Sequence, residues 1–126
     1  MQRLFQITAW LLALAIIFLS LVPPSLRPVT DLPHDLEHGA VFLLTGFAFG
    51  MGYPHRYWFQ SIALATFAGL IELAQFLVSG RHARLSDFIV DAVAVCAGIG
   101  AAWISVRTKP SPALVRLSKR LFWKEN

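Results

Sequence analysis

The segment GLIELAQFLVSGRHARLSDFIVDAV, residues 69 to 93, decides how the chain is interpreted. Its two apolar stretches each carry carboxylates, and a short turn with Arg81 and Arg84 joins them. The whole chain of 126 residues is 56% hydrophobic and only 14% charged. A soluble domain averages about 25% charged residues. The composition therefore indicates a membrane protein, and the segment places acidic groups inside its membrane-spanning part.

Four apolar segments predict four helices, at about 4–22, 38–53, 58–78 and 86–105. A membrane span needs about 20 mostly apolar residues, so the second segment is marginal, and a re-entrant segment is the alternative there. The first segment runs directly into two prolines without a small-residue cleavage site, so we expect an uncleaved helix rather than a signal peptide. The predicted fold is all-α, a polytopic bundle of four transmembrane helices within residues 1–105.

The basic residues are unevenly placed, because six of the eleven Lys and Arg lie in the tail, residues 106–126. Apolar residues at helical spacing alternate with them there, which predicts an amphipathic helix on an anionic inner leaflet. With the N-terminus inside, the outer side holds only Arg27, Arg81 and Arg84, and the positive-inside rule favours this orientation. We therefore expect both termini in the cytoplasm and no nucleic-acid partner.

The acidic residues have the opposite distribution, since six of the seven lie at or near the outer face in this orientation. Two pairs have helical spacing. Glu72 and Gln75 share a face because they are three positions apart, and Asp87 and Asp91 share one at four positions. The short turn between the two helices is expected to bring these faces together.

A polar site is therefore expected at the outer ends of these helices. Arg81 and Arg84 lie above the junction, and Ser86 can cap the helix that follows. An ionisable group at mid-bilayer costs about 2.5–3.5 kcal/mol, so Glu72 requires a cation, a proton or a ligand. No catalytic residue is assigned, and the candidate binding residues are Asp35, His38, Glu72, Gln75, Arg81, Arg84, Asp87 and Asp91.

Small residues recur along the second and fourth segments, and they predict a contact between two closely packed helices. Such residues let helix backbones approach one another in a membrane. They are Gly39, Gly46 and Gly50 in the second segment and Ala94, Gly98 and Ala102 in the fourth.

The segment HDLEH, residues 34 to 38, matches the H-x-x-E-H pattern of one class of zinc peptidase. That chemistry requires both histidines on one helical turn and a further ligand, for which Glu72 or Asp91 is available. A five-residue pattern arises easily, however, and Pro33 places the start of any helix at the first histidine. We therefore expect no metal site and no cofactor, and we interpret His38 as a helix-entry residue that is hydrogen-bonded to a carboxylate.

The order of these residues resembles the VanZ-like family of small bacterial integral membrane proteins, over about residues 31–104. The family has an acid and a His at the opening of a helix, E-x-x-Q late in the next, an Arg in the following loop and an Asp that opens the last helix. The chain departs from the family at Asp91, usually Asn, at Ala94, usually Gly, and at His34, where an acid often stands. The matching residues are Asp35, His38, Glu72, Gln75, Arg81 and Asp87.

The resemblance implies a VanZ-like domain in the bacterial inner (plasma) membrane and a role in the cell envelope. Together with the residues it favours a site that binds or handles an envelope glycolipid, a lipid-linked sugar or a lipid headgroup. Membrane lipids, and other membrane proteins as alternatives, are the expected partners. A second hypothesis is a structural or assembly subunit in which the polar cluster holds helices together. A membrane enzyme acting on a lipid is a third, and the sequence does not decide whether the protein is an enzyme.

Overall fold

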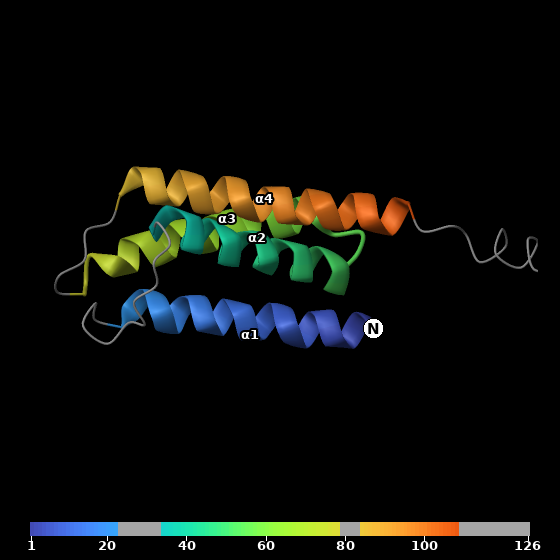
Figure 1. Ribbon diagram of the computed structural model, residues 1–126, viewed down its shortest axis with the longest axis horizontal. Helices are drawn as coiled ribbons and strands as arrows, with labels where there is room; N and C mark the ends of the chain where they lie inside the picture. The colour runs from blue at the N-terminus through green and yellow to red at the C-terminus, as the bar shows by residue number, and fades with distance from the viewer. Residues whose placement is uncertain (23–33, 79–83, 109–126) are drawn as a thin grey trace, which may run out of the picture.

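The computed structural model describes residues 1–22, 34–78 and 84–108, and these ranges contain four helices and no strand (Figure 1). The all-helical prediction is confirmed for these ranges. The predicted amphipathic helix of the tail lies outside the described residues. The helices are α1 (Gln2–Leu21), α2 (His34–Gly52), α3 (Tyr57–Gln75) and α4 (Leu85–Arg107).

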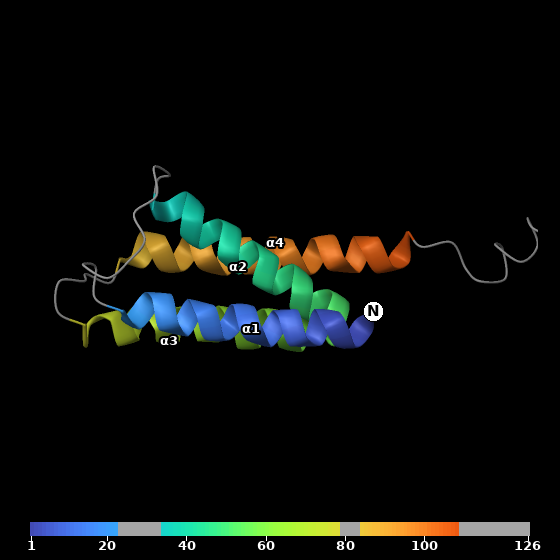
Figure 2. The ribbon, with the colours of Figure 1, turned by 60° about the horizontal axis from the view of Figure 1, so that its bottom comes forward.

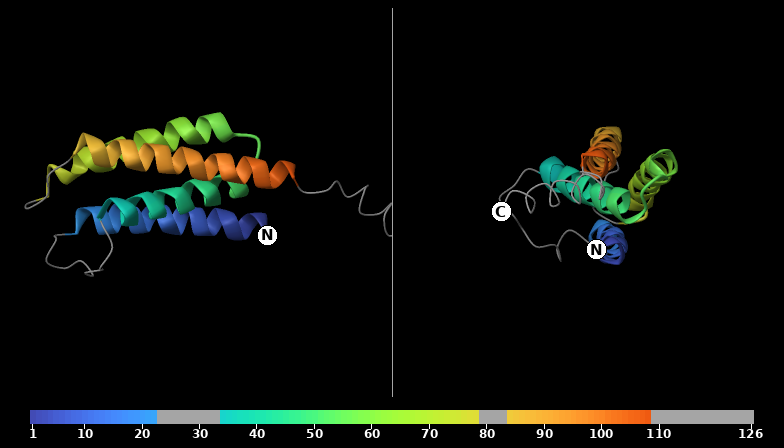
Figure 3. Two further views of the ribbon diagram at one scale, coloured as in Figure 1. Left: turned by 45° about the horizontal axis from the view of Figure 1, so that its top comes forward. Right: turned by 90° about the vertical axis from the view of Figure 1, so that its right-hand side faces the viewer.

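Consecutive helices run in opposite directions along the bundle, so the N-terminus and the end of α4 lie at the same end (Figures 1 and 3). α2 crosses the bundle obliquely between α4 and α1 (Figure 2). It is the central helix, because it packs against each of the other three, and most extensively against α4. We call the end where α2 and α4 begin and α3 ends the polar end, because the candidate residues lie there.

Three helices, α1, α3 and α4, are long and apolar enough to cross a membrane. The apolar part of α2 is shorter and runs over Leu36–Gly52. Many large apolar side chains face outward, among them Trp58, Leu77 and Leu85, which are 86%, 88% and 74% exposed. An apolar surface this extensive is unusual for a soluble monomer, and it suits a protein with lipid as its solvent.

Glycines allow α2 and α4 to touch at their backbones, and the predicted contact between small residues is confirmed. A Cβ added to Gly98 would overlap the carbonyl oxygen of Leu43, and one added to Gly46 would overlap the carbonyl oxygen of Val95. Further along, a Cβ on Gly50 would meet the side chain of Ala102. We call this contact the α2–α4 seam. Because backbone atoms fill it, the seam fixes how the two helices lie relative to each other.

α1 packs mainly along α2. At the end of the bundle opposite the polar end, hydrogen bonds join the first half of α1 to the end of α2. Gln6 Nε2 donates a hydrogen bond of 2.9 Å to the carbonyl oxygen of Gly52, at the end of α2. One turn further along α1, Trp10 Nε1 donates to the hydroxyl oxygen of Tyr53 at 3.1 Å. The buried residues of α1 recur every three or four positions: Ala9, Ala13, Ile16 and Ser20.

Candidate functional site

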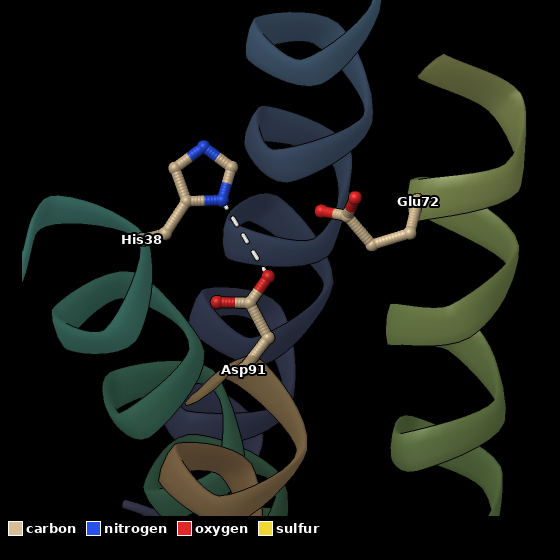
Figure 4. A group of neighbouring side chains, drawn as sticks. All are labelled: His38, Glu72 and Asp91. Carbon is tan, nitrogen blue, oxygen red and sulfur yellow. Dashed lines mark hydrogen bonds and ion pairs between the residues drawn. The ribbon is translucent and has the colours of Figure 1, made fainter. Parts of the chain in front are cut away.

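Three side chains from three different helices meet near the polar end of the bundle. His38 comes from α2, Glu72 from α3 and Asp91 from α4, and they are 8%, 5% and 0% exposed. Figure 4 shows the three side chains pointing toward one another. One nitrogen or oxygen atom from each lies within 4.8 Å of the corresponding atoms of the other two. We call these three residues the cluster.

The packing of the helices explains why these residues converge. Asp91 is buried on the same face of α4 as Val95, Gly98 and Ala102, at helical spacing. That face forms the seam with α2, so Asp91 extends the seam toward the polar end and meets α2 near the start of that helix. His38 lies there, with its ring stacked beside Phe42 at a centroid distance of 6.5 Å. The glycine seam thereby brings a carboxylate and an imidazole together.

The polar contacts within the cluster are long for bonds to charged groups. His38 Nδ1 lies 3.5 Å from Asp91 Oδ2, whereas charge-assisted N–H···O bonds are about 2.7–2.9 Å. Glu72 Oε1 accepts from Gln75 Nε2, and Glu72 Oε2 accepts from the backbone N–H of Arg84, both at 3.4 Å. The other oxygen of Asp91, Oδ1, is buried and has no hydrogen-bond partner within the described residues.

The charges of the cluster are poorly compensated by the part of the chain that the structure describes. Between residues of those ranges, the one contact between a basic and an acidic side chain is His38–Asp91, so no described cationic side chain pairs with Glu72. Removing an ionised carboxylate from water without a partner is strongly unfavourable. Glu72 therefore requires a proton or a cation that the described residues do not supply.

An open groove of about 740 Å³ runs between α3 and α4 and reaches the cluster at Glu72. Its walls are mainly apolar, with Arg84 and Leu85 near the polar end and Ile62 toward the middle of α3. The other lining residues are Ala65, Thr66, Gly69, Leu70, Leu73, Phe76 and Phe88. Glu72 thus belongs both to the buried cluster and to a groove that opens on the apolar outer surface of the bundle.

The structure brings some of the predicted site residues together and separates others. Glu72 and Gln75 are bonded to each other, and Glu72 is near His38 and Asp91. Arg84 reaches Glu72 through its backbone N–H, while its side chain is exposed at the groove. The side chain of Asp35, in the first turn of α2, and all of Arg81 lie outside the described residues.

The start of α4 differs from the expectation. The predicted cap by Ser86 is wrong, because the N-cap residue is Arg84 and no side chain bonds the free backbone groups there. Ser86 instead donates a hydrogen bond of 2.9 Å to Asp87 Oδ1. Asp87 is half-buried and stands outside the cluster, although it lies one turn before Asp91.

The sequence interpretation counted Glu37 among the six acidic residues of the outer face but left it out of the candidate binding residues. Glu37 Oε1 is buried without a hydrogen-bond partner in the described part of the chain. The groove was also missed. Its signal was a pair of small residues one turn apart, Ala65 and Gly69, on the face of α3 that carries Glu72.

The donor atoms of the cluster are of the kinds that hold metal ions, one imidazole nitrogen and two carboxylate oxygens. Of the HDLEH segment, His38 belongs to the cluster, and the side chain of His34 lies outside the described residues. The expectation that the chain holds no metal remains a prediction.

Comparison with known proteins gives no match to a family model, to a curated protein or to a solved structure. The resemblance to the VanZ-like family therefore remains an expectation from the residues quoted above.

Proposed function

We propose that this chain is a small VanZ-like integral membrane protein of the bacterial cell envelope, and that it binds an amphipathic envelope lipid. The acyl or polyprenyl chain of the lipid lies in the α3–α4 groove, and its headgroup lies at the polar end. The observation that carries the proposal is that an apolar groove ends at a buried carboxylate, Glu72, and an exposed guanidinium, Arg84.

The groove is suited to such a ligand in size and in polarity. Ligand sites typically enclose about 300–1,000 Å³ and combine apolar walls with a few polar groups. At about 740 Å³, the groove falls within this range, and its polar groups lie toward one end. An amphipathic lipid has the same division between an apolar chain and a polar head.

The polar groups suggest which headgroup chemistry is bound. A guanidinium recognises phosphate well, and Arg84 lines the groove at the point where a headgroup would leave it. Glu72 and Gln75 offer a carboxylate and an amide for sugar hydroxyl or amine groups. The shared ligand chemistry is therefore a phosphate next to hydroxyl or amine groups on a lipid chain, as in a phospholipid headgroup or a lipid-linked sugar.

The distribution of charge supports placing this site at the outer leaflet. Arg3, Arg56 and Arg107 belong to the end of the bundle opposite the polar end, where the N-terminus lies. The positive-inside rule assigns such an end to the cytoplasm. Both termini are then cytoplasmic, and α2 completes a four-helix transmembrane domain.

The test is photo-crosslinking of the purified chain in detergent to phosphatidylglycerol that carries a diazirine on an acyl chain. We expect labelling at residues of the α3–α4 groove, and we expect Arg84→Ala to reduce it several-fold. The matched control is Arg56→Ala, since Arg84 and Arg56 are the exposed N-cap residues of α4 and α3 at opposite ends of the bundle.

Competition then separates the two sources of the headgroup. A polyprenyl-phosphate sugar that displaces the probe better than unlabelled phosphatidylglycerol would identify a lipid-linked sugar as the ligand. Labelling spread equally over all four helices, and equal in both arginine variants, would show ordinary boundary lipid and contradict the proposal.

A structural role is the second candidate, and the position of the cluster favours it. His38, Glu72 and Asp91 connect α2, α3 and α4 at one point, so the cluster can hold three helices together in an assembly subunit. In that case Glu72→Gln lowers the thermal stability in detergent while lipid labelling of the folded protein stays unchanged.

A further inference from the structure

We propose that His38, Glu72 and Asp91 bind one divalent transition-metal ion, and that Zn²⁺ is the ion whose ligand preferences they fit best. The proposal goes beyond lipid binding and does not depend on it. It rests on the separation of the donor atoms, on their charge and on an oxygen of Asp91 that has no hydrogen-bond partner within the described ranges.

The separations are close to those of ligands on a shared ion. Zn²⁺ binds imidazole nitrogen and carboxylate oxygen at about 2.0–2.2 Å with tetrahedral geometry, which places neighbouring ligand atoms about 3.3–3.5 Å apart. His38 Nδ1 and Asp91 Oδ2 are 3.5 Å apart. This distance is long for a charge-assisted hydrogen bond, but it matches two ligands of one tetrahedral ion.

Glu72 becomes the third ligand after a small rotation of its side chain. The three donor atoms lie within 4.8 Å of one another, so the carboxylate of Glu72 has to move toward the other two by a rotation of its side chain. The two hydrogen bonds that hold this carboxylate, from Gln75 and from the Arg84 backbone, are both 3.4 Å long. Such weak bonds permit the rotation, and they then serve as the outer-shell contacts that ligating carboxylates commonly have.

Charge gives a separate reason for a cation. Two carboxylates with a neutral imidazole carry a charge of −2, which a divalent ion cancels. His38 lies beside Asp91, and Glu72 has no charged partner among the described residues. A buried carboxylate that is neither paired nor bound to a metal is neutralised by a proton, and a divalent ion allows both carboxylates of the cluster to remain charged.

The second oxygen of Asp91 also points to a ligand. Asp91 is fully buried, and its Oδ2 faces the other cluster residues while Oδ1 points away from Glu72 (Figure 4); Oδ1 has no hydrogen-bond partner in the described part of the chain. Buried polar atoms are nearly always bonded. A bound ion, or a water on the ion, supplies a partner for this carboxylate. Since Glu72 also lines the α3–α4 groove, an ion has a route of access to the cluster from that side.

The experiment measures metal binding by the full chain in detergent, prepared without a polyhistidine tag and stripped with a chelator. After dialysis against Zn²⁺, we expect one zinc per chain by elemental analysis. Each of the variants His38→Ala, Glu72→Gln and Asp91→Asn should bind zinc at least tenfold more weakly. The matched controls are Asp87→Asn, a carboxylate one turn before Asp91 and outside the cluster, and His55→Ala, at the opposite end of the bundle.

Wild-type protein alone provides a second readout, in case a cluster variant does not fold. Substituting Co²⁺ should give the intense visible absorption of a four-coordinate ion with nitrogen and oxygen ligands, and adding Zn²⁺ should raise the melting temperature. A wild-type chain that retains no zinc, a weak six-coordinate Co²⁺ spectrum, or folded cluster variants that bind zinc as well as the controls would each overturn the proposal. No lipid is needed in these measurements, so their outcome is separate from that of the lipid-binding test.

Discussion

α4 packs against two neighbours in opposite ways, closed against α2 and open against α3. At the α2–α4 seam, a Cβ on Gly98 has no room beside the backbone of α2. On the other side, the ring of Phe88 lies near Gly69 of α3, and the groove remains between the helices. At the seam the glycines bring backbone against backbone, whereas the groove has exposed walls of large apolar residues.

The difference suggests how a small bundle can be rigid and still have room for a ligand. The seam determines where Asp91 meets His38, because the seam joins the face of α4 that carries Asp91 to the face of α2 that carries His38. The groove reaches Glu72 from the apolar outer surface of the bundle. If this division is correct, similar substitutions should have very different effects on the two sides of α4.

The largest effect is expected at the seam. Gly98→Ala should lower the free energy of unfolding by about 1–3 kcal/mol, the usual range for overpacking, because the new methyl group meets the backbone of Leu43 and Phe47. Reversible unfolding in mixed micelles, followed by circular dichroism, measures this change.

The control lies two residues away on the same helix. A Cβ on Gly100 has no atom within 4 Å, so Gly100→Ala should be neutral or should stabilise the helix by about 0.5–1 kcal/mol. Equal effects of the two substitutions would show that α2 and α4 do not touch at their backbones.

A change on the groove side should affect ligand binding more than stability. Ala65→Trp places a large side chain in the groove, and we expect labelling by the diazirine lipid to fall to background. The free energy of unfolding should change by no more than about 0.5 kcal/mol, as for most surface substitutions. Ala63→Trp is the control, because Ala63 lines a different hollow, between α1 and α3. Loss of labelling in both variants would argue against the groove as the binding site.

The smallest effect is expected for Gly69→Ala, which makes the same change as Gly98→Ala on the open side. The added Cβ meets only the edge of the Phe88 ring, at 3.3 Å, and a ring beside an open groove can turn aside. The unfolding free energy should stay within about 0.5 kcal/mol of the wild-type value. A loss as large as that of Gly98→Ala would mean that α3 and α4 are packed as tightly as the seam.

Much of the fold could be predicted from the sequence because apolar length and small residues act locally. Each of the four apolar segments corresponds to a helix, with ends that differ by a few residues. The glycines of α2 and α4 also predicted their contact, since a backbone approach in a membrane requires small residues on both sides. The spacing of Glu72 and Gln75 correctly placed both on one face of α3.

The remainder of the site depends on which helices become neighbours, and spacing along one helix does not determine this. Asp87 and Asp91 share a face by position, yet only Asp91 belongs to the cluster, while Asp87 lies in the first turn of α4 and accepts a hydrogen bond from Ser86. For the same reason the contact of Arg84 with Glu72 involves a backbone N–H, where a guanidinium was expected. The groove required the relative position of α3 and α4, which local patterns do not give.

The seam also has a consequence for biosynthesis. α2 has the shortest apolar stretch of the four described helices, and its most extensive contact is with α4, the last of these four to be synthesised. Until α4 has been made, the glycine face of α2 lacks the backbone that it packs against in the folded bundle. We therefore expect the second helix to complete its insertion only when the fourth arrives. A nascent chain that stops before α4 would leave a half-inserted hairpin for the quality-control proteases of the membrane.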